Sequence, residues 1–498
     1  MANSLPRFFS ELPPSPDFNP VAKAIESTKD PKAEAALRLF ASMPPSTGVL
    51  ANPVRYTQPV PCDGVSVELN VRSFGMRGCL LEDDILTGSA DAVRVIFVGL
   101  FGRFPQSGEQ RAFSQILSEE FNQATTRILT RLAKFMKSFP NVTGDVAAQY
   151  MSAIRKAGND ARPVNGLRPS ADLLRDLIRV HLENAAVVAC SSYMRFLLSS
   201  RPRSDAAALA RQTKTFLKAG PQENPFHSIF NLLLHRKANA TEARILETLG
   251  AIQIHHGSAG SNMVARYLAS LHTKSVSDLF TAAHMTLDCA RHFGAITDLT
   301  EFVGTLERAP AKRQDELIRR RAIAGGLPTF GHPEIAVAGR SGRIEFDPRP
   351  ALYLAPLFEA IDAGAVRVSG PRMKRIRIVQ RLYQLAFVEG IEKPGRSGRL
   401  RIAPNTDFGA WIVQEALGVD EVDRTLLSFC FRGFGWMMDV REQLLQPIIR
   451  PVVPPDPAII PQPATGGVIP ETVVVVHNRL CQANAFTPAQ PSVVGAAG

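Results

Sequence analysis

Residues 424–445 read RTLLSFCFRGFGWMMDVREQLL and form one of the last strong helical patterns in the chain. Apolar residues recur every three or four positions along this stretch, which is the spacing of one helix face. Arg432 lies inside the apolar part of the pattern, between Phe431 and Phe434. Burying a guanidinium is costly unless it is paired, so we expect Arg432 to meet an anionic side chain or ligand. The stretch therefore predicts a buried helix with one functional charge.

The same spacing extends over most of the chain and predicts an all-α fold. Between residues 86 and about 238 the pattern is mostly helical, and one predicted helix face collects Phe121, Ile128, Leu132, Phe135 and Met136. Further helices are predicted at 241–254, 312–324, 352–389 and 409–417. The segment 331–350 is rich in Gly, Pro and Arg and predicts a loop. Strand signals are weak, and the clearest is Val473–Val476.

Both ends of the chain are rich in proline. The composition of the first sixty residues predicts an extended N-terminal segment. The prolines beyond Arg450 predict a C-terminal tail that cannot form an ordinary helix. With 498 residues, the chain is long enough for more than one domain. The sequence has no internal repeat.

Composition indicates a globular protein. Hydrophobic residues make up 45% and charged residues 21%, which supports a sizeable core. The net charge of +11 fits either a nucleic-acid partner or an enzyme with polyanionic ligands. The basic residues are dispersed, and there is no zinc-finger spacing, basic zipper or RNA-binding signature. We therefore expect no nucleic-acid partner.

The spacing of the cysteines and the length of the apolar segments indicate where in the cell the protein is located. The six cysteines are scattered without a CxxC pair, which is typical of reduced thiols in the cytoplasm. Residues 1–9 lack the pattern of a signal peptide, and the apolar window 93–101 is shorter than the ~20 residues that cross a bilayer. We expect a cytoplasmic protein without a membrane partner.

Several short motifs follow one another along the chain. They are His256-Gly257-Ser258-Ala259-Gly260-Ser261 with Arg266, His292-Phe293-Gly294-Ala295, Leu327-Pro328-Thr329-Phe330-Gly331-His332, Asp347-Pro348-Arg349, Asn405-Thr406-Asp407-Phe408, Phe431-Arg432-Gly433-Phe434-Gly435-Trp436 and Arg450-Pro451. Weaker motifs precede them at Phe74–Gly78 and Leu100–Pro105. Each motif alone is common, and the order is what makes the set specific.

This ordered set resembles the citrate synthase family from about residue 74 to 451. The resemblance implies a homodimer of two-domain helical subunits. A large domain would comprise residues 1–292 and 409–498, and a small domain residues 293–408. It further implies an enzyme that joins an acyl-CoA to a 2-oxo acid, such as acetyl-CoA to oxaloacetate, and then hydrolyses the thioester. Coenzyme A would enter as part of the substrate, with no separate cofactor and no metal.

The resemblance also assigns roles. Removing a proton beside a thioester requires a base and a donor at the developing enolate oxygen, in a water-poor site. Asp407 matches the family's base, His292 the donor, and His332 the acid that polarises the ketone. The 2-oxo acid would be bound by His256 and by arginines that pair with carboxylates, Arg349, Arg432 and Arg450. The CoA-binding candidates are Phe330, Gly331, Arg340 and Arg343.

The match has departures. Phe293 replaces a glycine beside the first catalytic histidine, Gly257 replaces a frequent acidic residue, and Pro333 replaces a frequent arginine. The stretch between His332 and Asp347 is longer than usual. Since Phe293 and this stretch lie nearer the acyl-CoA, we expect altered acyl-CoA preference. Two alternatives remain open: an enzyme that cleaves a citryl-CoA-like thioester, and an inactive homologue that binds a CoA ester or a protein.

Two other interpretations of the region around His255 and His256 are a metal site and a phosphate-binding loop. His255 and His256 are sequence neighbours, so on a helix they point to different faces and no third ligand is spaced to join them. The small-residue segment Gly257–Ser261 follows a helix and lacks the lysine of a nucleotide-binding loop. Neither reading predicts a site here.

Overall fold

The computed structural model describes the central part of the chain in most detail. The described residues are 49–52, 55–58, 75–76, 79–80, 91–101, 104–106, 108–157, 171–218, 224–255, 260–271, 273, 275–287, 294–324, 326–331, 349–392, 399–400, 402 and 404–444. All of them belong to one compact unit, Met1–Pro451. The predicted strand Val473–Val476 and the proline-rich tail lie outside the described residues.

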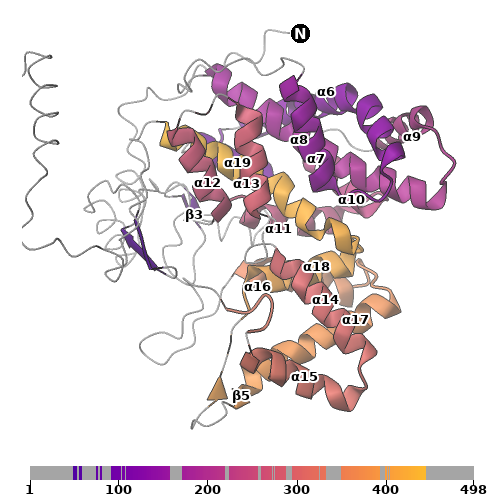
Figure 1. The fold of residues 1–498 in the computed structure, drawn as a ribbon, viewed down its shortest axis with the longest axis vertical. Coiled ribbons are helices and arrows are strands. Elements are labelled where there is room, and N and C mark those ends of the chain that lie inside the picture. The colour runs from indigo at the N-terminus through magenta and orange to yellow at the C-terminus, as the bar shows by residue number, and fades with distance from the viewer. Residues whose placement is uncertain are drawn as a thin grey trace, which may run out of the picture. The chain divides into compact units, whose positions relative to one another are not determined.

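The described residues confirm the all-α prediction (Figure 1). The first half contains α5 (Ala92–Phe101), α6 (Glu109–Ser138), α7 (Gly144–Ala157), α8 (Ala171–Ser200), α9 (Ala206–Lys218), α10 (Pro225–Leu234) and α11 (Ala240–Gln253). The second half contains α12 (Gly260–Ser270), α13 (Val276–Leu287), α14 (Gly294–Arg308), α15 (Ala311–Ala324), α16 (Arg349–Asp362), α17 (Gly370–Tyr383), α18 (Thr406–Leu417) and α19 (Arg424–Gln443). None of the described helices is long and apolar enough to span a bilayer.

The strands are short antiparallel pairs. They are β1 (Val49–Asn52) with β2 (Arg55–Gln58), β3 (Gly75–Met76) with β4 (Cys79–Leu80), and β5 (Ile391–Glu392) with β6 (Arg399–Leu400). The sequence did not predict these pairs, because segments of two to four residues are too short to show an alternating pattern.

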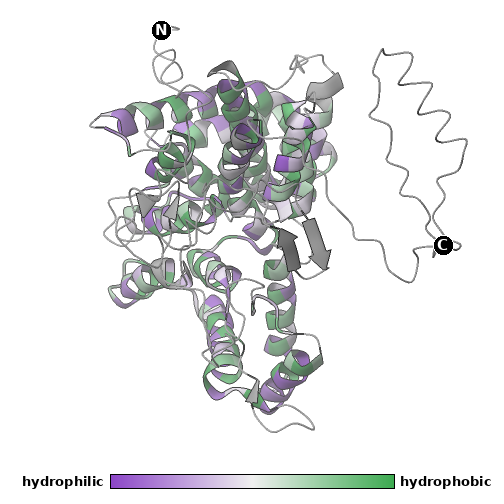
Figure 2. Ribbon diagram, turned by 90° about the vertical axis from the view of Figure 1, so that its left-hand side faces the viewer, coloured by the Kyte–Doolittle hydropathy of each residue, from purple (hydrophilic) through white to green (hydrophobic). Residues whose placement is uncertain are grey.

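The core is centred on α8, which packs against α6, α7, α10 and α19. Its middle, Ala185–Cys190, is entirely buried and consists of small and β-branched residues with one thiol. Side chains of this size let several helices approach α8 closely. The predicted apolar face of α6 is buried as expected, from Phe121 to Met136. Figure 2 shows the resulting alternation of apolar and polar residues around the helices.

Glycines in α19 allow it to pass unusually close to its neighbours. A Cβ atom on Gly433 would lie 2.0 Å from the His181 ring, and one on Gly435 would lie 2.0 Å from the carbonyl oxygen of Ile254. Any side chain at either position would therefore collide with α8 or with the end of α11. The two glycines of the R-G-F-G-W stretch thus let α19 pass directly against α8 and the end of α11.

Three helix boundaries differ from the sequence predictions. α16 begins at Arg349, inside the predicted loop, and α18 begins at Thr406, three residues before the predicted start. The side-chain oxygen of Asn405 caps α18 by accepting from the backbone N–H of Asp407 at 3.0 Å. The predicted helix 352–389 is divided, and it ends in a π-helical turn at Gln384–Glu389.

Candidate active site

Asp407, the predicted base, lies in the first turn of α18 and is half-buried. The N-terminal end of a helix carries partial positive charge, which stabilises a carboxylate there. Asn405 fixes this turn by capping the helix at Asp407. The carboxylate is therefore held on a rigid element at the start of a buried helix.

Asn405 also joins this turn to the predicted CoA-binding segment. Its side-chain amide donates to the carbonyl oxygen of Gly331 at 3.1 Å, and its backbone N–H donates to the carbonyl oxygen of Thr329 at 3.0 Å. Phe330 forms a β-bridge with Pro404. Phe330 and Gly331 are thus brought beside Asp407, although more than seventy residues separate them in sequence.

The backbone around Phe330 is strained. Thr329 has φ 62°, and among the described residues it is one of two non-glycines in the left-handed region. Gly331 has φ 82°, which a glycine adopts without penalty. A β-branched residue in this region costs on the order of 1–3 kcal/mol, and such positions cluster at functional sites. The bonds from Asn405 hold this conformation.

Arg349 is the first residue of α16, and the first turn of that helix packs against the first turn of α18. The Tyr353 hydroxyl donates to the carbonyl oxygen of Thr406 at 2.6 Å. A Cβ atom on Gly409 would lie 2.7 Å from the Tyr353 ring and 3.0 Å from Pro350, so only glycine fits. The structure therefore brings together the helix turns that contain Arg349 and Asp407.

Arg432 belongs to a second group of buried polar residues. Its guanidinium is 2% exposed and donates to the side-chain oxygen of Asn262 at 3.4 Å. The amide of Asn262 in turn donates to Asp439 at 2.5 Å. Asp439 is seven residues after Arg432 and therefore lies near the same face of α19. Arg432 is thus buried, as its place in the apolar pattern suggested, and the side chain it donates to here is a neutral amide. The anionic partner or ligand expected for it stays a prediction.

Asp439 is the centre of this second group. It is fully buried, and it pairs with His255 Nε2 at 2.9 Å and with Arg266 Nη2 at 2.7 Å. Burial by itself would raise the pKa of Asp439, but the charges of His255 and Arg266 and the bonds from His255 and Asn262 hold that pKa below its usual value. Asp439 is therefore a permanent negative charge inside the protein.

Sequence reasoning missed Asp439 and Asn262. A carboxylate two turns after a buried arginine was visible in the sequence, and it was a usable signal. Its partners, however, come from the end of α11 and from α12, and no local pattern connects those helices with α19. His255 was considered only as a metal ligand, whereas its ring pairs with Asp439.

The two groups lie on helices that share a neighbour. α11 packs against α19 and also against α16 and α18. The first group comprises Phe330, Gly331, Asp407 and the start of α16, and the second comprises Arg432 with its partners. The other predicted site residues, His256, His292, His332, Arg340, Arg343 and Arg450, lie outside the described residues, as does the side chain of Arg349.

Two features of the described residues lie apart from these groups. A cavity of about 830 Å³ is lined by residues of the helix starts at Asp91, Gly108, Asn224 and Asn239, and its lining contains no predicted site residue. Among the described residues, one cluster has the geometry of metal ligands, and it is formed by His235, Asp420 and Asp423. No residue of either site group belongs to that cluster.

Comparison with solved structures supports the fold. The citrate synthase of Thermotoga maritima has a TM-score of 0.56 and 17% identity, covering 80% of this chain and 92% of that one. The citrate synthase of Thermoplasma acidophilum, solved with carboxymethyl coenzyme A and oxaloacetate, has a TM-score of 0.57 and 18% identity, covering 80% and 93%. That of Pyrobaculum aerophilum has a TM-score of 0.55 and 17% identity, covering 80% and 89%.

Comparison by sequence gives the family. No curated protein sequence matches the chain. The family model of the citrate synthase C-terminal domain matches residues 76–452, which is well over half of the protein. The matched family and the shared fold support a condensing enzyme of the citrate synthase type. The chain belongs to the citrate synthase family.

Proposed function

We propose that this protein condenses an acyl-CoA with a 2-oxo acid and then hydrolyses the thioester. Asp407 removes the proton beside the thioester carbonyl, and the resulting carbon nucleophile attacks the ketone of the 2-oxo acid. His292 donates to the enolate oxygen and His332 to the ketone oxygen, so that neither oxygen carries a full negative charge. The observation that carries the proposal is the pair of bonds from Asn405, which bring the segment before His332 beside Asp407.

The 2-oxo acid is expected to be dicarboxylic, like oxaloacetate. Arg432 is buried and already oriented by Asn262, so a carboxylate can bind it without ordering a long side chain. Arg349 at the start of α16 and His256 complete the binding set in this proposal. Arg450 would contribute from the partner subunit of a homodimer. The neighbour from Thermoplasma acidophilum was solved with oxaloacetate, which supports this substrate class.

Coenzyme A is proposed to lie against Phe330 and Gly331. Gly331 has no side chain, so a ligand can approach its backbone closely, and its φ of 82° is a conformation that glycine adopts without strain. Arg340 and Arg343 would then reach the phosphates of coenzyme A. The proposal includes the two domains, 1–292 with 409–498 and 293–408, with closure of the small domain excluding water. A cytoplasmic location is supported by the scattered cysteines.

The test is an assay of thiol release with acetyl-CoA and propionyl-CoA against a panel of 2-oxo acids. We expect wild-type turnover with a dicarboxylic 2-oxo acid, and a loss of at least about 10³-fold in kcat for Asp407→Asn. Asp315→Asn serves as the control, because this partly exposed carboxylate pairs with Arg381 and neither residue belongs to a site group. A preference for acetyl-CoA would contradict the expected effect of Phe293 on acyl-CoA choice.

Two outcomes would overturn the proposal. Release of acetyl-CoA from citryl-CoA, without net condensation, would identify a cleavage enzyme. No turnover with any substrate pair, together with binding of a CoA ester, would identify an inactive homologue.

A further inference from the structure

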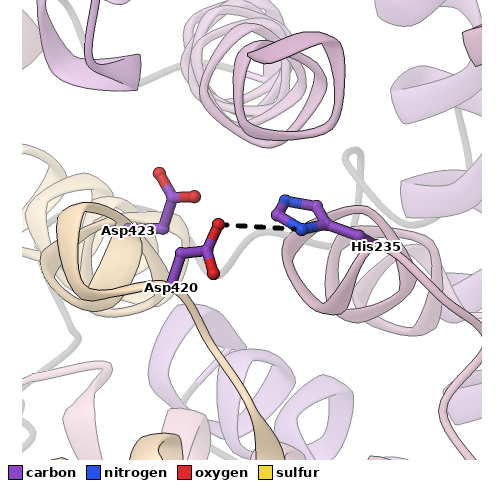
Figure 3. Close-up of side chains that lie close together, drawn as sticks. All are labelled: His235, Asp420 and Asp423. Atoms are coloured by element: carbon purple, nitrogen blue, oxygen red, sulfur yellow. Dashed lines mark ion pairs between the residues drawn. The ribbon is translucent and has the colours of Figure 1, made fainter. Parts of the chain in front are cut away.

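A cluster at the junction of α10, α18 and α19 has no role in the proposed reaction (Figure 3). His235 follows α10 in the left-handed conformation, with φ 55°. Asp420 and Asp423 lie in the short turn between α18 and α19. One ligand-type atom from each of these three residues lies within 4.8 Å of the others, and Nδ1 of His235 is 3.8 Å from Oδ2 of Asp420.

The hydrogen bonds of Ser192 decide which ring nitrogen of His235 carries the proton. The Ser192 hydroxyl donates to Oδ2 of Asp423 at 2.5 Å, and the Arg195 guanidinium donates to the same carboxylate oxygen. Ser192 Oγ also lies 2.9 Å from Nε2 of His235. A hydroxyl has a single proton, so Ser192 accepts from His235 and Nε2 carries the hydrogen.

In a neutral His235, Nδ1 therefore has no hydrogen, and as a hydrogen-bond acceptor it faces the carboxylate of Asp420, another acceptor. Oδ1 of Asp423 is a second such acceptor, because it is buried and accepts no hydrogen bond from the residues that the structure describes. A buried acceptor left without a partner costs about 1–3 kcal/mol. Three acceptors that converge without a shared donor indicate that a cation belongs between them.

A proton on Nδ1 is the alternative cation, and the surroundings oppose it. Burial lowers the pKa of His235 by more than the charges of Asp420 and Asp423 raise it, and the charge of Arg195 adds a smaller lowering. The ring also stacks on that of Phe196, with the two ring centroids 4.6 Å apart, which fixes its orientation. A neutral, fixed imidazole is the form that binds metals.

We propose that Nδ1 of His235 and carboxylate oxygens of Asp420 and Asp423 bind a divalent transition-metal ion of the zinc class. Zinc accepts nitrogen and carboxylate ligands at about 2.0–2.2 Å, so two ligands of one ion lie about 3–4 Å apart. The observed separations require side-chain movement of no more than about 1 Å. The ion would tie the end of α10 to the turn that precedes α19.

The residues around the cluster suit such an ion. A metal-bound histidine usually donates its other ring N–H to a fixed partner, the place that Ser192 occupies. Arg195 binds the second oxygen of Asp423 and leaves Oδ1 for the ion. The Asp420 side chain is 47% exposed, which gives an ion access from solvent and leaves room for a water ligand. The carboxylates of Asp420 and Asp423 and the guanidinium of Arg195 together have a net charge of −1. A bound divalent cation would change the net charge of the cluster to +1.

The test is zinc titration of the full-length protein after removal of metals, followed by isothermal calorimetry and thermal unfolding. We expect one zinc per chain and a rise in Tm with zinc but not with magnesium. Asp420→Asn should weaken zinc binding by at least about 10-fold, and His235→Gln by at least about 100-fold. Asp420 is exposed enough that its variant should fold. The matched control is His227→Gln, since His227 lies 3.7 Å from Glu247 in a similar contact that belongs to no three-residue cluster among the described residues.

Zinc binding that is absent in the wild type, or unchanged in both the His235 and Asp420 variants, would overturn this inference. Cobalt gives a second readout, because a tetrahedral site yields visible absorption that the His235 variant should lose. Neither measurement depends on turnover, so this inference and the proposed function can fail separately.

Discussion

The side-chain amide of Asn405 donates to the carbonyl oxygen of Gly331 at 3.1 Å, while the side-chain oxygen of the same residue accepts from the backbone N–H of Asp407. The side-chain amide of Asn405 thus fixes both the first turn of α18, which contains Asp407, and the segment Phe330–Gly331. Its two functions use different atoms, and substitutions can separate them.

Asn405→Ser keeps an oxygen that can cap α18 but loses the donor to Gly331. We therefore expect kcat to fall by about 10-fold or more, with little change in Tm, because the Phe330–Gly331 segment is no longer held beside Asp407. Asn405→Ala loses both functions and should cost about 1 kcal/mol of stability in addition. Kinetics and thermal unfolding of the two variants check this. Equal kcat for wild type and the serine variant would contradict it.

A second prediction concerns Asp439 and its effect on Arg432. In Asp439→Asn the anchor of Asn262 is weakened, and Asn262 is the partner that orients Arg432. We expect KM for the 2-oxo acid to rise by about 10-fold or more, and KM for the acyl-CoA to change by less than about 3-fold. In an Arg432→Lys background the same change should have a much smaller effect, since coupled residues are not additive.

The control for this comparison of single and double variants at Asp439 and Arg432 is Glu415→Gln. Glu415 is another fully buried carboxylate, and it pairs with Arg424 and Arg375. Its variant should lose stability without changing the ratio of the two KM values. Additive effects of Asp439→Asn and Arg432→Lys would show that Asp439 has only a structural role.

The fold was predictable from the sequence because it depends on local periodicity. The buried face of α6 and the apolar pattern of 424–445 were read directly from residue spacing. Helix starts were less predictable: the cap at Asn405 was not recognised, and α16 begins in a segment rich in Gly, Pro and Arg. The motif order predicted Asp407 and Arg432. The Asp439 network and the His235 cluster join distant helices, so no short window of sequence could predict them.

The close approach of α19 gives a third prediction. In Gly435→Ala the new Cβ would lie 2.0 Å from the carbonyl oxygen of Ile254, which is backbone and cannot turn away. We expect a loss of about 1–3 kcal/mol in the free energy of unfolding, measured by urea denaturation. The matched control is Gly304→Ala in α14, where the nearest atom is the flexible end of Arg308 at 3.6 Å. That variant should gain about 0.4–1 kcal/mol, and an equal loss in both would refute this account.

A fourth prediction follows from His181, which is fully buried beneath α19. Its Nε2 donates to the carbonyl oxygen of Cys430 at 2.9 Å, and Nδ1 has no hydrogen-bond partner among the described residues. Burial lowers the pKa of His181 to about 4, and its bond to Cys430 opposes this only in part. In the unfolded chain the imidazole binds a proton below about pH 6.5.

Between pH 6.5 and 4 the unfolded state therefore binds more protons at this residue than the folded state does. The free energy of unfolding must then fall as the pH falls, by about 3 kcal/mol over the whole interval. We expect His181→Gln to unfold more easily at pH 7 but to lose less stability between pH 6.5 and 4.5 than the wild type. Urea midpoints measured across this range give the slope. A wild-type slope in His181→Gln would show that His181 is not buried as a neutral ring.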